Sequence, residues 1–193
     1  MTEGNVPAGS TPFQKILHGR RSIRRYLPAP VDPEKIRTCL EAARLAPSAH
    51  NAQPWRFIVV DDPELKDRLT TAAFSGIYSG SKFAARAPVL LVLLVKLEFV
   101  ANRLGARFQG VPYHFVDMGI AGEHIVLQAE ELGLATCWMG WFNYRKVRKV
   151  LKIPRRYKVI ALMPLGYAEK RPNREPPRKT FEEVVTFNGI ERE

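Results

Sequence analysis

Residues 89–96 read Val-Leu-Leu-Val-Leu-Leu-Val-Lys, an apolar run with no glycine or proline inside it. A continuous run of this kind is typical of a strand whose two faces are both covered in a folded core. The run is too short to cross a bilayer as a helix. It therefore predicts the central strand of a sheet, and the rest of the fold is built outward from it.

On either side of this strand the sequence alternates between strand-like and helix-like stretches. N-cap residues followed by proline, at Thr11-Pro12, Asp32-Pro33 and Asp62-Pro63, each predict the start of a helix. The first of these helices is expected to turn Phe13, Ile16 and Leu17 inward. Further strands are predicted over residues 55–60, 135–138 and 158–166, a strand-like tail over 180–186, a mobile segment over 74–86, a loop over 102–112 and a basic helix over 144–151.

The longest predicted helix, residues 116–132, is apolar nearly all round. Such a helix is either buried or part of an interface between chains. Because helices and strands alternate imperfectly along the chain, the pattern alone leaves the fold class as α/β or α+β.

The length of 193 residues suits one domain, predicted over residues 12–193 after a loose leader at 1–11. We expect no membrane partner, because no apolar stretch is long enough to span a bilayer. Cys39 and Cys137 lie far apart without a metal-binding spacing, so the sequence predicts two reduced core thiols, no metal site and a cytoplasmic protein.

The net charge of +11 comes from one part of the chain. Between Trp141 and Lys179 there are 13 Lys and Arg residues against two acidic residues, and the remainder is balanced. A solvated basic helix face, a phosphate-bearing ligand and a nucleic acid are all consistent with this excess.

Two clusters contain residue types suited to chemistry. Arg20-Arg21-Ser22-Ile23-Arg24 supplies three guanidinium groups and a hydroxyl, donors that fit a phosphate and a polarised ring oxygen. Residues 46–55 read Ala-Pro-Ser-Ala-His-Asn-Ala-Gln-Pro-Trp, a polar loop stiffened by two prolines. A loop that is both rigid and polar is expected to position a ligand.

These two clusters, in this order, resemble the opening of the FMN-dependent nitroreductase family. The resemblance continues through Asp117-Met118-Gly119, through residues 133–140 (Gly-Leu-Ala-Thr-Cys-Trp-Met-Gly), through Pro164-Leu165-Gly166-Tyr167 and through residues 177–183 (Pro-Arg-Lys-Thr-Phe-Glu-Glu). Each motif is modest by itself, but their order and spacing together are specific.

The resemblance implies a set of residues that bind FMN. Arg20, Arg21 and Ser22 resemble ligands of the ribityl phosphate, and Arg24 stands where a basic residue faces the pyrimidine side of the flavin. Arg178 matches an arginine that returns to the phosphate. Ser48 and Asn51 correspond to residues that reach the flavin from the partner subunit, and Met139 and Gly140 match a loop whose backbone N–H groups face the ring.

The resemblance also implies an α+β fold with a mostly antiparallel central sheet flanked by helices, in a homodimer whose C-terminal strands are exchanged. NADH or NADPH would reduce FMN, and a nitroaromatic, quinone-like or related small acceptor would then be reduced in a ping-pong mechanism. No catalytic side chain is required, because the flavin performs the redox chemistry. His50, Trp138 and Trp141 remain possible substrate contacts.

Three alternatives stay open from the sequence. The chain is also compatible with a specialised relative, either a dehalogenase or a flavin-cleaving enzyme, and with a flavin carrier that has no activity. A basic nucleic-acid-binding module is the alternative from another class. Because no recognised nucleic-acid motif accompanies the basic segment, we expect that segment to serve phosphate-bearing cofactors and not nucleic acid.

Overall fold

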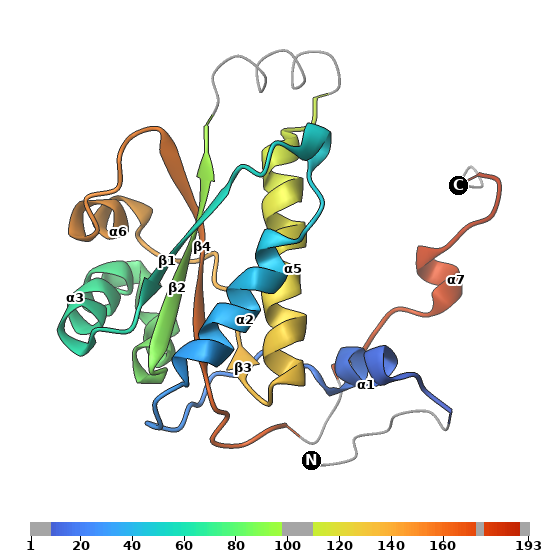
Figure 1. Cartoon of the computed structure of the whole chain (residues 1–193), viewed down its shortest axis with the longest axis horizontal. Coiled ribbons are helices and arrows are strands. Elements are labelled where there is room, and N and C mark those ends of the chain that lie inside the picture. Colours follow the sequence, from blue (N-terminus) through green and yellow to red (C-terminus); the bar gives the residue numbers. More distant parts are fainter. Residues whose placement is uncertain (1–8, 98–109, 173–175, 190–193) are drawn as a thin grey trace.

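The computed structural model describes residues 9–97, 110–172 and 176–189. Within these residues the strands form one sheet in the order β1-β2-β4-β3, and every pair of neighbouring strands is antiparallel (Figure 1). The strands are β1 (Trp55–Val60), β2 (Val89–Lys96), β3 (Ala135–Thr136) and β4 (Tyr157–Gly166). The prediction that residues 89–96 form a central strand is confirmed, since β2 is paired on both edges.

Helices cover both faces of the sheet, which makes the fold α+β as the resemblance implied. Alternate side chains of β2 supply two separate cores. Leu91, Leu93 and Val95 pack towards α2 (Pro33–Arg44) and α5 (Tyr113–Glu131). Leu90, Val92 and Leu94 pack on the opposite face, towards α3 (Pro63–Ala73) and α6 (Tyr144–Val150).

The helix starts predicted from N-cap residues are confirmed. Asp32 accepts a hydrogen bond from the Glu34 N–H at the start of α2, and Asp62 accepts one from Leu65 at the start of α3. α1 (Pro12–Gly19) opens with a capping box between Thr11 and Gln14. These bonds satisfy backbone donors that a helix N-terminus otherwise leaves without partners.

Two expectations about local structure are corrected, and a third stays a prediction. Residues 180–186 do not form a strand in this chain: Phe181–Val184 form the short helix α7, which begins at a capping box between Thr180 and Glu183. The mobility expected for residues 74–86 stays a prediction; these residues contain the 3-10 helix η2 (Gly76–Arg86), with Ala84 fully buried. Phe13 and Leu17 of α1 do not point inward; their exposed fractions are 56% and 47%.

The C-terminal segment stands away from the body of the chain, beyond α1 (Figure 1). Its large apolar side chains are uncovered: Phe181 is 61% exposed, Val184 64% and Phe187 79%. Together with Phe13 and Leu17 they leave apolar surface on one side of the molecule. Several large apolar side chains left exposed on neighbouring elements are typical of an interaction site.

Some expectations fall on residues that are not described: residues 1–8 of the predicted leader, and residues 102–109 of the predicted loop. Among the described helices, none is both long and apolar enough to cross a membrane. The described residues also contain no group of three or more His, Cys, Asp or Glu side chains placed to bind a metal ion.

Candidate functional site

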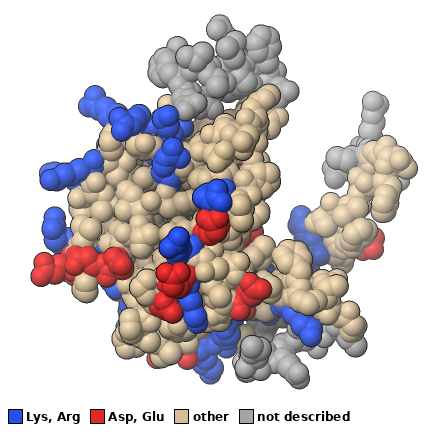
Figure 2. Space-filling view, viewed as in Figure 1, with Lys and Arg blue, Asp and Glu red and all other residues tan. Residues whose placement is uncertain are grey.

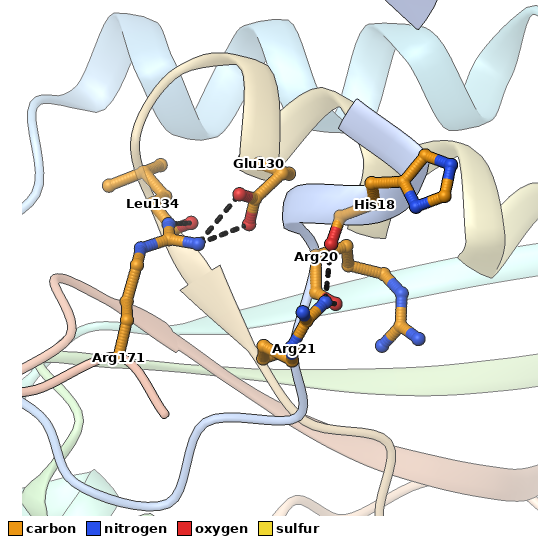
Figure 3. A network of polar contacts seen from close by, with 6 residues as sticks. All are labelled: His18, Arg20, Arg21, Glu130, Leu134 and Arg171. Carbon is orange, nitrogen blue, oxygen red and sulfur yellow. Dashed lines mark hydrogen bonds and ion pairs between the residues drawn. The ribbon is translucent and has the colours of Figure 1, made fainter. Parts of the chain in front are cut away.

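Two arginines that are far apart in the sequence line the same pocket. Arg21, which follows α1, and Arg178, which precedes α7, form its walls together with Leu17, His18 and Pro176. The Arg21 guanidinium donates to the backbone carbonyls of His18 and Arg20, the latter at 2.8 Å, so its position is fixed by the end of α1 (Figure 3). The pocket presents two planar cations, which suit a phosphate group.

An ion pair anchors the segment that leads to Arg178. Arg171 Nη1 donates to both carboxylate oxygens of Glu130 on α5, at 2.6 and 2.8 Å, and Arg171 Nη2 donates to the Leu134 carbonyl at 3.2 Å (Figure 3). The same carboxylate lies against Gly19, where a Cβ atom would come within 3.0 Å of it. Glu130 therefore holds the residue 171 region at one end of α5, and the end of α1 lies close to the same carboxylate. Sequence analysis did not identify this pair.

Ser22 and Arg24 lie on a short extended stretch beside β3. The Ile23 N–H donates to the Thr136 carbonyl at 3.0 Å, and the Ile23 side chain is buried, with an exposed fraction of 2%. Because side chains alternate along extended backbone, Ser22 and Arg24 point to the other side, where both are exposed. They line a second pocket with Ile23, Arg25, Lys170 and Pro172.

Cys137, which follows β3, interacts with this stretch and is 4% exposed. Burial raises the pKa of Cys137, while the Arg24 charge and a hydrogen bond from Ser22 oppose the rise. Burial also raises the pKa of Cys39, to about 12. Both thiols are free and buried, as the sequence predicted. Neither has the lowered pKa of a nucleophilic cysteine.

In the loop after β3, Gly140 is exposed, whereas the backbone of Met139 is hydrogen-bonded to β4. The Met139 N–H donates to the Leu162 carbonyl and the Leu162 N–H donates back to Met139, both at 3.0 Å. Of the two peptide groups that the resemblance assigned to the flavin ring, the N–H of Met139 is thus engaged with β4. Trp141, next along the chain, donates from Nε1 to the Ile77 carbonyl at 3.1 Å.

The polar loop before β1 has an unusual backbone. His50, Asn51 and Gln53 have φ values of 51°, 53° and 44°, in the left-handed region that side chains other than glycine seldom occupy. This loop contains η1 (Ala49–Asn51). Ser48 Oγ accepts from the Gln53 N–H at 3.0 Å, and Asn51 Oδ1 accepts from Gln53 Nε2 at 3.0 Å. Strained loops that the surrounding structure over-determines cluster at ligand sites.

A buried carboxylate holds this loop. Asp117 on α5 is 4% exposed, and its Oδ1 accepts from the Ala49 N–H at 3.0 Å. The sequence showed Asp117 only as part of a motif, with no role. The available signal in the sequence was its helical spacing with the apolar Ala121 and Ile125, which predicts a buried carboxylate. A buried carboxylate requires hydrogen-bond partners.

The loop and the arginine cluster lie at opposite ends of α5. The loop is hydrogen-bonded to Asp117, whereas Arg171 is paired with Glu130 and Gly19 lies close to it. These two α5 residues are about 20 Å apart along the axis at about 1.5 Å per residue. Arg21 and Arg178 share one pocket, and Ser22 and Arg24 line the next. One chain does not bring Ser48 and Asn51 to these groups.

Comparisons with known proteins agree with this architecture. The sequence profile described as "Nitroreductase family" matches residues 17–167 of the chain. A "NADH dehydrogenase" of Thermus thermophilus is 36% identical in an alignment that covers 77% of this chain and 82% of the relative. An iodotyrosine deiodinase of Thermotoga neapolitana is 27% identical over 88% of this chain and 94% of the relative.

Solved structures give the same result. A nitroreductase family protein from Clostridium novyi NT superposes with a TM-score of 0.74 at 31% identity, covering 86% of this chain and 89% of that one. An FMN-dependent nitroreductase from Clostridium difficile R20291 superposes with a TM-score of 0.73 at 31% identity, covering 91% and 98%. From the extent of the profile match and from these identities, we conclude that the chain belongs to the Nitroreductase family.

Proposed function

We propose that the protein is an FMN-dependent oxidoreductase that takes electrons from NADH or NADPH and reduces nitroaromatic, quinone-like or related small acceptors. The observation that carries the proposal is the pocket shared by Arg21 and Arg178, next to the exposed Ser22 and Arg24. Several relatives carry the name NAD(P)H nitroreductase, and one similar solved structure is described as FMN-dependent.

The donor set at this site fits the chemistry of FMN. A phosphate monoester carries about two negative charges at neutral pH, and Arg20, Arg21 and Arg178 supply cations for it. Arg24 and the Gly140 backbone are assigned to the ring. Bound by these residues, FMN would supply the redox chemistry, the transfer of an electron pair from the nicotinamide to the acceptor.

The protein's own residues would bind, orient and tune this group. Arg21 is already oriented by the His18 and Arg20 carbonyls, so it loses little freedom when it binds a phosphate. Arg24, on the exposed side of its stretch, would stabilise negative charge at the pyrimidine edge. We assign no side chain as a general acid or base.

We further propose that the working unit is a homodimer. Ser48 and Asn51 are assigned to the partner's cofactor, because in their own chain they lie at the far end of α5 from Arg21. The exposed apolar side chains of α1 and α7 would be covered by the partner. Residues 180–189 would cross to the second subunit, and the buried thiols are compatible with a cytoplasmic enzyme.

The test is steady-state kinetics of the purified protein with FMN, varying NADPH against a fixed series of menadione concentrations. Because donor and acceptor would use the same site in turn, double-reciprocal plots should give parallel lines. Intersecting lines would contradict the ping-pong order. A protein that neither retains FMN nor oxidises NADPH or NADH would contradict the proposed function as a whole.

A second candidate activity is reductive dehalogenation. Iodotyrosine deiodinases from two organisms are each 27% identical to this chain over more than four-fifths of its length. Release of iodide from iodotyrosine by the reduced enzyme, faster than menadione reduction, would favour this activity.

A further inference from the structure

A group of exposed cations lies on α6 and on the turn that leads into β4. We call it the basic patch; it comprises Arg145, Lys146, Lys149, Lys152, Arg155 and Arg156, and all six residues are exposed. Arg56, at the start of β1, is exposed beside it. The hydrogen bond and charge of Arg156 and the charge of Arg56 lower the pKa of the same tyrosine, Tyr157. Figure 2 shows blue side chains without red ones over α6 and the start of β4, at the upper left.

Within the part of the chain that the structure describes, no acidic side chain forms an ion pair with the basic patch. No Asp or Glu occurs anywhere between residues 132 and 168. Among the described residues, none of the six cations lies within 4.0 Å of a carboxylate, whereas Arg44 and Arg171 do. The helix dipole stabilises the charge of Lys149, because this residue is in the last turn of α6. Lys152, Arg155 and Arg156 follow the helix and are not part of its last turn. Uncompensated like charges destabilise a folded chain, which indicates that the patch serves binding.

The FMN phosphate does not account for this charge. The structure divides the basic segment of the sequence between two places. Arg178 and Arg171 belong to the end of the molecule where α1 meets α5. The basic patch lies on the opposite face of the sheet, where α6 packs against α3.

The contacts that the residues of the basic patch make argue against nucleic acid as its ligand. Arg145 lies over the ring of Tyr144 at 5.8 Å and Arg156 over that of Tyr157 at 5.2 Å, so one face of each ring already has a guanidinium beside it and is not available for stacking with a base. α6 is short and packs against α3, which leaves no helix free to enter a groove of duplex DNA. Neither pocket described above touches the patch.

An exposed surface dominated by positive charge instead fits a transient protein encounter. Electron-transfer complexes are at the small end of protein interfaces, and complementary charge raises their association rate. The basic patch also adjoins the loop assigned to the flavin ring. Lys146 Nζ donates to Ser75 Oγ at 2.9 Å, and Trp141, beside Gly140, donates to the Ile77 carbonyl two residues further on.

We propose that the basic patch docks an acidic electron-carrier protein, which supplies electrons to the enzyme by a second route beside NADH or NADPH. The proposal rests on the proposed function, because it requires a flavin near Gly140. Two reduced carriers would each give up one electron and become oxidised. The flavin would take up both electrons together with a proton from water, and the acceptor would be reduced as before.

The probe for the test is an acidic plant-type ferredoxin, a carrier with a potential of about −400 mV. The ferredoxin is reduced, freed of reductant and mixed anaerobically with the FMN-loaded enzyme. The patch variant is Lys149→Glu/Arg155→Glu. The control variant is Arg37→Glu/Arg44→Glu on α2, which reverses the same number of exposed charges far from the patch.

We expect the second-order rate of flavin bleaching to fall about tenfold in the patch variant, and to fall in the wild type when salt rises from about 50 to about 300 mM. The control variant should keep its rate within about twofold, and NADPH should reduce all three proteins equally. Ferredoxin affinity, measured calorimetrically on the flavin-free proteins, should likewise fall in the patch variant and stay close to the wild-type value in the control variant.

Equal losses in the two variants, or a rate independent of salt, would overturn the proposal. So would a DNA duplex that binds more tightly than ferredoxin and is sensitive to the patch variant, which would assign the basic patch to nucleic acid. A protein that retains no FMN would instead contradict the proposed function, and the calorimetric comparison would still measure docking.

Discussion

Arg178 and Arg24 are assigned to opposite ends of one cofactor, so their removal should have different consequences. A charge-assisted hydrogen bond to phosphate contributes about 1.5–3 kcal/mol in both redox states. Arg178→Ala should therefore weaken FMN binding by about ten- to a hundredfold and leave the reduction potential unchanged. Arg24→Ala should retain FMN but lower the potential, because negative charge at the pyrimidine edge develops on reduction.

The expected decrease for Arg24→Ala is about 30 mV, which corresponds to about 1.4 kcal/mol for a two-electron couple. Reductive titration against a dye of known potential measures it, and a fluorescence titration measures FMN affinity. Each variant is the control for the other. If the potential decreases equally in both, or only in Arg178→Ala, the assigned orientation of the flavin is wrong.

Asp117 is the residue for which the structure adds a role. Asp117→Ala removes the acceptor of the Ala49 N–H, and a polar group left buried without a partner costs about 1–3 kcal/mol. The strained loop also loses its tie to α5, so FMN affinity should fall. Asp117→Asn keeps a side-chain oxygen and should lose less of both. Thermal unfolding and FMN titration measure the two effects; an alanine variant that matches wild type in both would exclude this role.

At the scale of elements, α7 shows where sequence patterns fail. Val184, Val185 and Thr186 are β-branched and favour a strand, yet the capping box at Thr180 starts a helix. A four-residue helix shows too little periodicity to be recognised.

β2 and α5 were predictable because long apolar runs are compatible with few other structures. Of the site, the arginines and the polar loop were recognisable as motifs, whereas the Arg171–Glu130 pair depends on long-range contacts that no local pattern contains.

The α1 and α7 elements carry a prediction about assembly. Removal of residues 180–193 deletes the exposed Phe181, Val184 and Phe187 but no buried residue among those described. The shortened chain should therefore keep its core and lose its partner, because apolar contact area drives association. Light scattering should give a monomer and far-ultraviolet circular dichroism a folded protein. A shortened chain that remains fully dimeric would contradict the proposed role of this segment.

At the scale of the whole molecule, the proposal depends on two chains supplying one site. The sequence could assign Ser48 and Asn51 to the cofactor only through a resemblance, because intrachain geometry places them about 20 Å along α5 from the Arg21 end. The exposed apolar side chains on α1 and α7 are the physical signal that a second chain would cover this surface. Amphipathic patterning identified Phe13 and Leu17 as side chains to be covered, but it does not indicate which chain covers them.

The most direct test of this account is sedimentation velocity of the FMN-loaded protein, recorded at once by protein absorbance and by flavin absorbance. The account predicts that flavin absorbance sediments only with a dimer, with one FMN for each chain, and that dilution to monomer releases the cofactor. Flavin absorbance that sediments with a monomer, or a dimer that carries no flavin after reconstitution, would contradict it.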